Sequence, residues 1–354
     1  MNLFELTRKL IDIPSVSGEE DAVGRFLFDY LHEYGFDVER QEISPGRANI
    51  IATNGERAPR LMLSTHMDTV PPHIASSEDR EFIYGRGACD AKGIIAAEIE
   101  AARRLIEEGH ADIGLLFTVD EEQASLGARA LNSHRLARSC KFLINGEPTD
   151  NKLATGSKGS LRVRIHTKGR AAHSAYPEQG ESAIEKLLDV LASLRAWSWP
   201  ANDFFGETTC NIGVIAGGTR TNVIPAEAHA DLHFRLATHS SVVQELIEKV
   251  ARGRAVVEYL SASEPVRMLS VEGFEQSVVR FTTDITYLSN WGEPLLLGPG
   301  SIFVAHTEHE RVSKCELEES VELYIRLASA LLAEDNSSTN QETMRAEAVR
   351  KALG

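Results

Sequence analysis

The stretch LMLSTHMDTVPP, residues 61–72, decides the fold class of this chain. It begins with three apolar residues, as a buried β-strand does, and it places His66 and Asp68 where the strand ends. Strands that are apolar on both sides are typical of α/β sheets with covered faces. The stretch therefore predicts a buried strand that delivers an imidazole and a carboxylate to one edge of a sheet.

The composition is that of a globular chain, with 354 residues, 42% of them hydrophobic and 25% charged, which is long enough for two domains. Lys plus Arg number 37 against 52 Asp plus Glu, a net charge of -15. Phosphate backbones and anionic lipids repel such a chain, so we expect neither a nucleic acid nor a membrane partner. The four cysteines form no CxxC pair, and the start of the chain has no signal-peptide pattern. These features predict reduced thiols and a cytoplasmic location.

Apolar strands alternate with helical patterns in the first 150 residues. Ser17 and Glu20 have capping-box spacing ahead of a helix whose apolar stripe runs from Val23 to Leu31. A second helix is expected over about 91–108. Strands are expected at 49–53, 61–65, 113–119 and 141–145. Alternating strands and helices predict an α/β fold, a mixed sheet flanked by helices on both faces.

The pattern changes after GSKGS, residues 156–160. Amphipathic strands and two helices follow, as in a small α+β domain whose sheet has one solvated face. Core-like segments return near residue 267, including the strand-like run EPLLLGPGSIFVA at 293–305. We therefore expect three parts: a first domain of residues 1–157 and 268–335, an inserted domain of residues 158–267, and a frayed or locally helical tail of residues 336–354.

Four apolar runs end in side chains that bind metals or move protons. LMLST leads to His66 and Asp68, IGLLFTV to the acids at 120–122, KFLIN to Glu147 and SIFVA to His306. Strand ends gather at one edge of an open α/β sheet. Each motif on its own is typical of an ordinary polar loop. Several carboxylates buried together, however, would lower the stability of the fold by several kcal/mol unless cations compensate their charge. Their repetition therefore indicates a metal site.

The run GRGACDAKG supplies one more carboxylate, Asp90, just ahead of a helix. Its GxG also invites a nucleotide-binding interpretation. The third glycine of GxGxxG is absent, and Lys-Gly stands where a phosphate-binding loop needs Gly-Lys followed by Ser or Thr. We therefore exclude both nucleotide motifs.

Seven motifs together resemble the M20 family of metallopeptidases and deacylases, and they cover nearly the whole chain in order. They are HMDTVP, GRGACDAKG, DEE at 120–122, GEP at 146–148, AAHSAYP, GGTRTNVIP and GPGSIFVAHTEHE. The resemblance implies a di-zinc catalytic domain interrupted by a lid and dimerisation domain. It also implies a homodimer formed through that lid.

The resemblance implies five metal ligands: His66, Asp90, Glu122, Glu147 and His306. Asp90 would bridge two ions, with His66 and Glu147 on one and Glu122 and His306 on the other. Imidazole and carboxylate ligands suit Zn²⁺, with Co²⁺ or Mn²⁺ as substitutes. His309 lies three residues beyond His306, and the residues alone leave either as the ligand; the resemblance favours His306.

Catalytic roles follow from the same resemblance. Glu121 resembles the general base that takes a proton from the attacking water and later delivers it to the leaving amine. Asp68 resembles the carboxylate that orients the ring of a metal-binding histidine. His173 resembles the lid histidine that reaches a catalytic site, often the partner subunit's, to stabilise the oxyanion. Two lid residues resemble substrate contacts, Asn222 and Arg235.

The implied function is a metal-dependent amidohydrolase that removes an N-acyl group from a small amino acid, most similar to acetylornithine deacetylase. Two alternatives remain open within the family. One is a succinyl-diaminopimelate desuccinylase or another lysine-pathway deacylase, and the other is a dipeptidase or carboxypeptidase. A non-catalytic relative would lack the base or a ligand, and this sequence retains every one.

Overall fold

The chain forms two compact units. The computed structural model describes residues 1–55 and 58–353, with side chains as far as Ala333. The first unit comprises Met1–Thr155, Met268–Ser277 and Thr283–Gly354, and the second comprises Gly156–Arg267 and Val278–Thr282. The second unit thus includes Val278–Thr282, which the sequence had assigned to the catalytic domain. Arg235 on the second unit donates to Thr282 Oγ1 at 3.4 Å, a contact that associates this short segment with that unit.

A nine-stranded mixed sheet forms the centre of the first unit. The strand order is β1-β2-β6-β3-β7-β17-β8-β15, with β16 paired to β8. β3 runs parallel to β6 and β7, and β17 runs parallel to β7. The bounds are β1 Asp37–Ser44, β2 Arg47–Thr53, β3 Leu61–His66, β6 Ile113–Thr118, β7 Phe142–Asn145, β8 Leu153–Ser157, β15 Val266–Arg267, β16 Gln276–Val279 and β17 Glu293–Leu296. The predicted mixed α/β sheet is confirmed.

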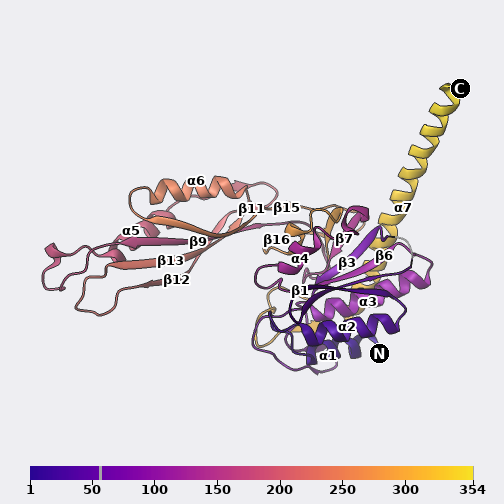
Figure 1. Ribbon diagram of the computed structural model, residues 1–354, viewed down its shortest axis with the longest axis horizontal. Helices are drawn as coiled ribbons and strands as arrows, with labels where there is room; N and C mark the ends of the chain where they lie inside the picture. Colours follow the sequence, from indigo (N-terminus) through magenta and orange to yellow (C-terminus); the bar gives the residue numbers. More distant parts are fainter. Residues whose placement is uncertain (56–57, 354) are drawn as a thin grey trace. The chain divides into compact units, whose positions relative to one another are not determined.

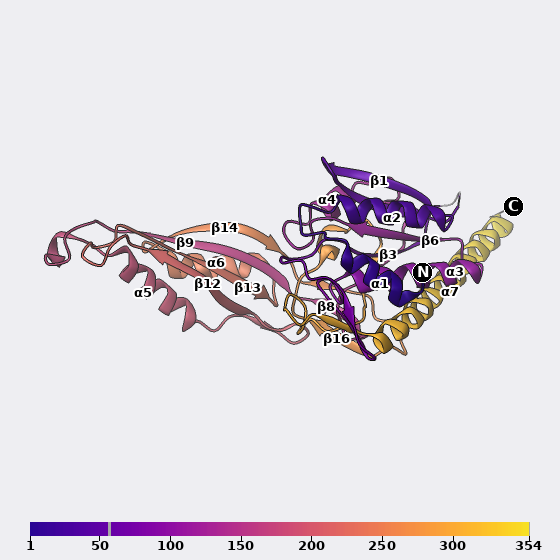
Figure 2. The same cartoon turned by 90° about the horizontal axis from the view of Figure 1, so that it is seen from below.

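Both faces of this sheet are covered. Leu61 and Leu63 of β3 pack toward the longer helices, which lie side by side in Figures 1 and 2, whereas Met62 packs into a separate cluster on the opposite face. The first face carries α1 Leu3–Asp12, α2 Asp21–Glu33, α3 Lys92–Glu107 and α7 Lys314–Leu353. The opposite face carries α4 Leu126–Leu131 and the short 3₁₀ helices η1 Ala137–Ser139 and η3 Asp284–Tyr287. Burial on both faces explains why β3 begins with three consecutive apolar residues.

Two local predictions were wrong. The capping box fails because α2 starts at Asp21, and the Ser17 hydroxyl donates instead to Asp68 Oδ2 at 2.6 Å. The run SIFVA is not a strand, since Val304 N donates to Ser301 O in a turn and His306 has a φ of 63°. The expected tail of residues 336–354 begins within α7, which continues to Leu353.

The second unit holds a four-stranded antiparallel sheet in the order β12-β13-β9-β14. The strands are β9 Gly159–Lys168, β12 Thr209–Gly217, β13 Glu227–Leu236 and β14 Val256–Ser263. Alternate residues of β9 and β13 are buried against α5 Ala183–Arg195 and α6 Ser240–Ala251. The remaining face of the sheet is polar and more exposed, as its alternating sequence predicts.

Short elements complete the two units. They are β4 Ser77–Glu78, β5 Phe82–Tyr84 and β18 Arg311–Ser313 in a small sheet, the hairpin β10 Ala201–Asn202 and β11 Gly206–Glu207, and η2 Pro177–Gln179. Among the described residues, no helix has the length and apolar character needed to cross a bilayer.

Candidate metal centre

The first unit gathers four predicted site residues near the ends of its central strands. His66 is the last residue of β3 and pairs with Thr118, the last residue of β6. Glu121 and Glu122 follow β6, and Glu147 follows β7. Because β3, β6 and β7 are parallel, their carboxyl ends meet at one edge of the sheet. The fold thereby places side chains from three separate segments at that edge.

Asp90 lies between two imidazoles. Its Oδ1 is 2.9 Å from His66 Nε2, and its Oδ2 is 3.2 Å from His306 Nε2. His306 Nε2 is also 2.9 Å from Glu122 Oε1. Ligand atoms of His66, Asp90 and Glu122 all lie within 4.8 Å of one another. One carboxylate oxygen facing each imidazole is the arrangement that a bridging ligand between two ions requires.

Glu147 provides a test of whether the cluster fits a cation. It is 5% exposed, and its Oε1 has no hydrogen-bond partner among the described residues. Burial raises the pKa of Glu147 well above its ordinary value. A buried oxygen without a partner is costly, and a positive ion offsets that cost. The donor set of imidazoles and carboxylates therefore fits a divalent transition metal.

The electrostatics of the two histidines show how strongly this cluster attracts positive charge. Burial alone would lower the pKa of His66, but the Asp68 and Asp90 carboxylates hold it well above its ordinary value. Hydrogen bonds to Asp90 and then to Glu122 raise the pKa of His306 to about 10. Protons on these imidazoles would occupy the positions that metal ions take in a loaded site.

Asp68 connects His66 to the segment that bears the paired glutamates. His66 Nδ1 lies 3.0 Å from the Asp68 backbone oxygen and 3.5 Å from its Oδ1, which leaves Nε2 to face Asp90. The Asp68 carboxylate accepts from Glu121 N at 3.1 Å and from Glu122 N at 3.2 Å. The predicted orienting carboxylate therefore also holds the turn that follows β6.

Glu121 is a half-buried residue beside the cluster. Burial, with a further contribution from the Glu147 carboxylate, raises its pKa well above the ordinary value. No hydrogen bond involves its carboxylate oxygens among the described residues, although its backbone N–H is bound by Asp68. A carboxylate of raised pKa is a stronger proton acceptor, as a general base requires.

Sequence reasoning missed Glu310. This buried carboxylate pairs with Arg86, and its Oε1 accepts from Gly87 N at 2.9 Å and Asp90 N at 3.3 Å. It therefore ties the segment carrying His306 to the loop carrying Asp90. Its position four residues after His306, inside the motif HTEHE, was the available signal. His306 and His309 are both exposed, but the contacts to Asp90 and Glu122 are made by His306.

The predicted site residues of the second unit lie in two separate places. Residues 173 and 223 form a β-bridge, and Ser174 N donates to Asn222 O at 3.0 Å, so exposed His173 and Asn222 are neighbours. Arg235 lies near the far end of β13, opposite Ser160. At about 3.3 Å per strand residue, the eight steps from residue 227 to residue 235 along β13 span roughly 25 Å. One small ligand does not reach both groups within one chain.

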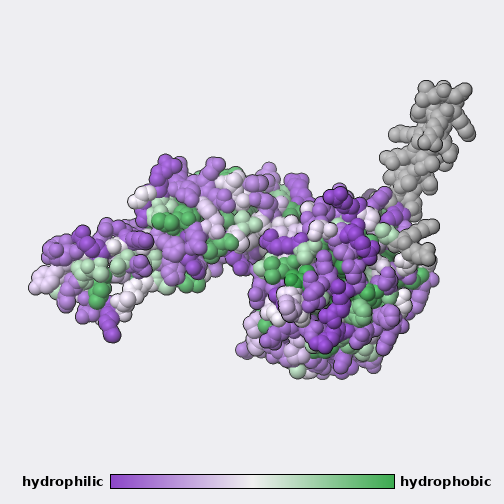
Figure 3. Space-filling view, in the orientation of Figure 1, coloured by the Kyte–Doolittle hydropathy of each residue, from purple (hydrophilic) through white to green (hydrophobic). Residues whose placement is uncertain are grey.

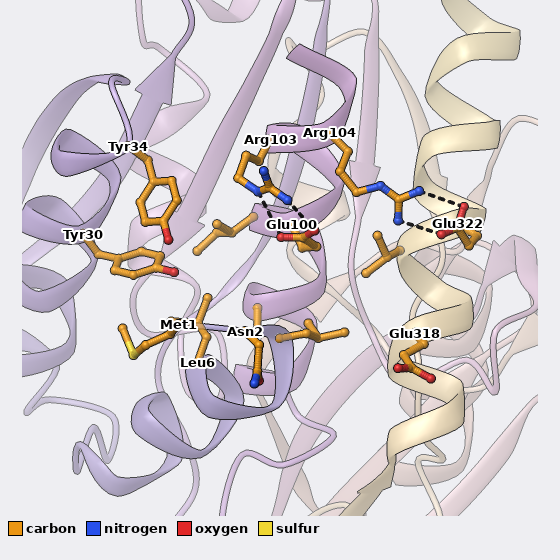
Figure 4. A pocket seen from close by; sticks show the side chains of 14 residues that line it. Met1, Asn2, Leu6, Tyr30, Tyr34, Glu100, Arg103, Arg104, Glu318 and Glu322 are labelled. Atoms are coloured by element: carbon orange, nitrogen blue, oxygen red, sulfur yellow. Dashed lines mark hydrogen bonds and ion pairs between the residues drawn. The ribbon is translucent and has the colours of Figure 1, made fainter. Parts of the chain in front are cut away.

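A surface cavity of about 550 Å³ lies elsewhere in the first unit, among α1, α2, α3 and α7 (Figure 4). Its guanidinium groups are ion-paired, Arg103 with Glu100 and Arg104 with Glu322. No histidine lines it. The cavity therefore offers none of the chemistry found at the strand ends.

Two peptidase domain families match parts of the chain, "Peptidase dimerisation domain" over residues 155–256 and "Peptidase family M28" over residues 49–193. A probable carboxypeptidase from Paracoccidioides lutzii is 38% identical, covering 94% of this chain and 86% of its own. A peptidase M20 domain-containing protein from Schizosaccharomyces pombe is 36% identical, covering 92% of this chain and 84% of its own.

Solved structures share the fold. A tripeptidase from Staphylococcus aureus has a TM-score of 0.77 at 23% identity, covering 92% of this chain and 96% of its own. An M20 family metallo-carboxypeptidase from Sulfolobus solfataricus has a TM-score of 0.73 at 17% identity, covering 92% and 98%. With relatives similar over more than nine-tenths of its length, the chain belongs to the M20 family of metallopeptidases and is a hydrolase of amide bonds.

Proposed function

We propose that this protein is a di-metal carboxypeptidase-type hydrolase that releases an amino acid from the end of a small peptide or acyl substrate. The observation that carries the proposal is the Asp90 carboxylate, which faces His66 with one oxygen and His306 with the other. The curated relatives named above include a probable carboxypeptidase, which favours this reaction over the deacetylase that the motifs first indicated.

In this proposal Asp90 would be shared by two ions. His66 and Glu147 would hold one of them, and Glu122 and His306 would hold the other. Zn²⁺ suits this mixture of imidazole and carboxylate, and Co²⁺ or Mn²⁺ has compatible ligand preferences. Bound divalent ions supply Lewis acidity and make water acidic enough to lose a proton near neutral pH.

Glu121 serves as the general base. Its buried carboxylate takes a proton from the attacking water and later gives that proton to the nitrogen of the leaving amine. The Asp68 carboxylate assists by accepting hydrogen bonds from the backbone N–H groups of Glu121 and Glu122. These bonds fix the position of the base relative to the ends of the strands. One side chain thus performs both proton transfers.

His173 donates to the developing oxyanion, and Asn222, its neighbour, contacts the substrate. Arg235 recognises the substrate carboxylate with a two-pronged hydrogen bond. Because roughly 25 Å separates Arg235 from the start of β13 in one chain, these groups serve the same substrate only if they come from different chains. We therefore propose a homodimer in which His173 acts in the partner subunit's site. The match to a dimerisation domain over residues 155–256 supports this arrangement.

Exposed apolar side chains suit the second unit to an interface between subunits. They include Val214, Ile215, Val256, Tyr259 and Leu260 on the edge strands β12 and β14. Green hydrophobic areas interrupt the purple surface of this unit in Figure 3. Edge strands with exposed apolar residues readily pair with another chain.

An N-acyl amino acid deacylase is the second candidate, because it too releases an amino acid with a free carboxylate. A substrate panel separates the two. Purified protein is assayed with dipeptides, tripeptides, acetylornithine and succinyl-diaminopimelate, and with C-terminal carboxamide analogues. We expect the fastest turnover on small peptides with a free C-terminus and little on their amides. Higher kcat/KM on acetylornithine would favour the deacylase, and equal rates on carboxylates and amides would refute carboxylate recognition.

A further inference from the structure

A buried acid outside the seven motifs lies next to the base-bearing turn. Asp284 is 3% exposed and begins η3, where the chain re-enters the first unit after Val278–Thr282. Its Oδ2 accepts a hydrogen bond from the Thr118 hydroxyl at 2.8 Å, across 166 positions of sequence. Its Oδ1 has no hydrogen-bond partner in the part of the chain that the structure describes. The proposed chemistry gives this carboxyl group no role.

Thr118 connects Asp284 to the candidate base. It is the last residue of β6, it pairs with His66 on β3, and Glu121 follows three residues later. The Ser125 hydroxyl, at the other end of the same turn, is a second polar neighbour of Asp284. Asp284 therefore binds Thr118 at the beginning of the turn and lies near Ser125 at its end.

The turn needs such external contacts because its backbone is strained. Asp120 and Ser125 have φ values of 72° and 53°, in the left-handed region that is unfavourable for a residue with a side chain. Asp68 holds the middle of the turn through two backbone N–H groups, and Arg47 pairs with Asp120. Among the described side chains, Asp284 alone binds the Thr118 hydroxyl at the end of β6, which also lies 3.5 Å from the Thr65 backbone oxygen.

We infer that Asp284 is a positioning residue, which anchors the end of β6 through Thr118 and thereby fixes the direction in which Glu121 points. The inference rests on the proposed role of Glu121. It assigns Asp284 no contact with the substrate or with the ions. Its effect on the reaction should therefore appear in turnover, since a base displaced by about 1 Å can lose on the order of 100-fold in rate.

The test is a set of variants assayed for kcat, KM, bound metal and melting temperature. Asp284→Ala and Thr118→Val should each lower kcat roughly 10- to 100-fold while KM and metal content stay within about twofold. The double variant should be no slower than the slower single variant, because both remove one contact. Asp284→Asn and Thr118→Ser keep the acceptor and the donor, so each should recover most of the lost turnover.

Several results would overturn the inference. Unchanged kcat in Asp284→Ala would do so, as would additive losses in the double variant. Loss of metal together with kcat would make Asp284 a purely structural residue. If Asp284→Ala does not fold, the Thr118→Val and Thr118→Ser pair decides by the same criteria. Glu121→Gln is run in parallel: full activity there refutes the base itself, whereas an inactive Glu121→Gln beside a fully active Asp284→Ala refutes only the positioning role.

Discussion

The two units present their candidate residues in opposite ways. The first unit buries most of its metal-binding candidates, since His66, Asp90 and Glu147 are each 5% exposed or less, although His306 is exposed. The second unit leaves His173 and Asn222 on its surface. Buried charges must be compensated, whereas exposed polar groups are solvated at little cost. The site in the first unit can therefore be recognised from the burial and charge of its residues. The exposed residues of the second unit can be assigned a role only through a partner or a substrate.

Removing the metal ions should have the largest effect, because it acts on the buried cluster of the first unit. Stripping divalent ions with a chelator should abolish activity, because the ligands of the first unit then hold only protons. It should also lower the free energy of unfolding by about 4 kcal/mol for each ion that had been present at a thousand times its dissociation constant. Activity assays and thermal unfolding before and after chelation measure both. Re-adding Zn²⁺ or Co²⁺ should restore them, and full activity in excess chelator would contradict the account.

Glu121→Gln should lower kcat on the order of a thousandfold or more, because the amide accepts no proton from water. Bound metal should remain at the wild-type level, since Glu121 is not among the proposed ligands. Single-turnover kinetics and elemental analysis of the same preparation provide the two readings. A variant that keeps its turnover, or one that loses its metal, would disprove the assignment.

His173→Ala should lower kcat about 100-fold, the usual effect of removing one oxyanion donor. His229→Ala, on β13 of the same unit, is the matched control and should stay near wild type. Mixing Glu121→Gln chains with His173→Ala chains sharpens the comparison, because statistical exchange between symmetric dimers should restore about a quarter of wild-type activity. Recovery requires His173 to act across subunits; no recovery after demonstrated exchange would place its action within one chain.

Arg235→Lys should have the smallest effect, a rise in KM of roughly tenfold with little change in kcat. Losing one of the two charged hydrogen bonds weakens binding of the ground state and of the transition state by the same amount. Arg162→Lys, on the neighbouring strand, serves as the control. Michaelis constants on a peptide with a free carboxylate measure the effect. A fall in kcat at constant KM would assign Arg235 a different role.

The sequence could anticipate that part of the candidate site would converge, for a physical reason. His66, Glu122 and Glu147 lie at or beyond the ends of apolar runs that form parallel strands, and parallel strand ends converge. The expected strand before His306 is absent, because a turn with positive φ carries that histidine. Motif resemblance, rather than periodicity, identified that histidine.

Contacts between distant segments were beyond the sequence. Ser17 looked like a helix cap, and only the folded chain brings its hydroxyl to Asp68, 51 residues away. Asp284 lies in a polar stretch without periodicity, and its partner Thr118 is 166 residues earlier. Such pairs leave no local pattern, because tertiary packing alone decides them. The domain boundary near Val278–Thr282 has the same origin.

The central claim is that the buried cluster around Asp90 binds two divalent ions, one of them with Glu122. Titrating Co²⁺ into metal-free protein, with binding followed by calorimetry and by the visible spectrum of the ion, tests it most directly. We predict two equivalents per chain for the wild type, and one tight equivalent for Glu122→Gln with the second weakened at least tenfold, since a charged ligand is lost. Failure of the wild type to bind two equivalents, or identical titrations for both proteins, would contradict the account.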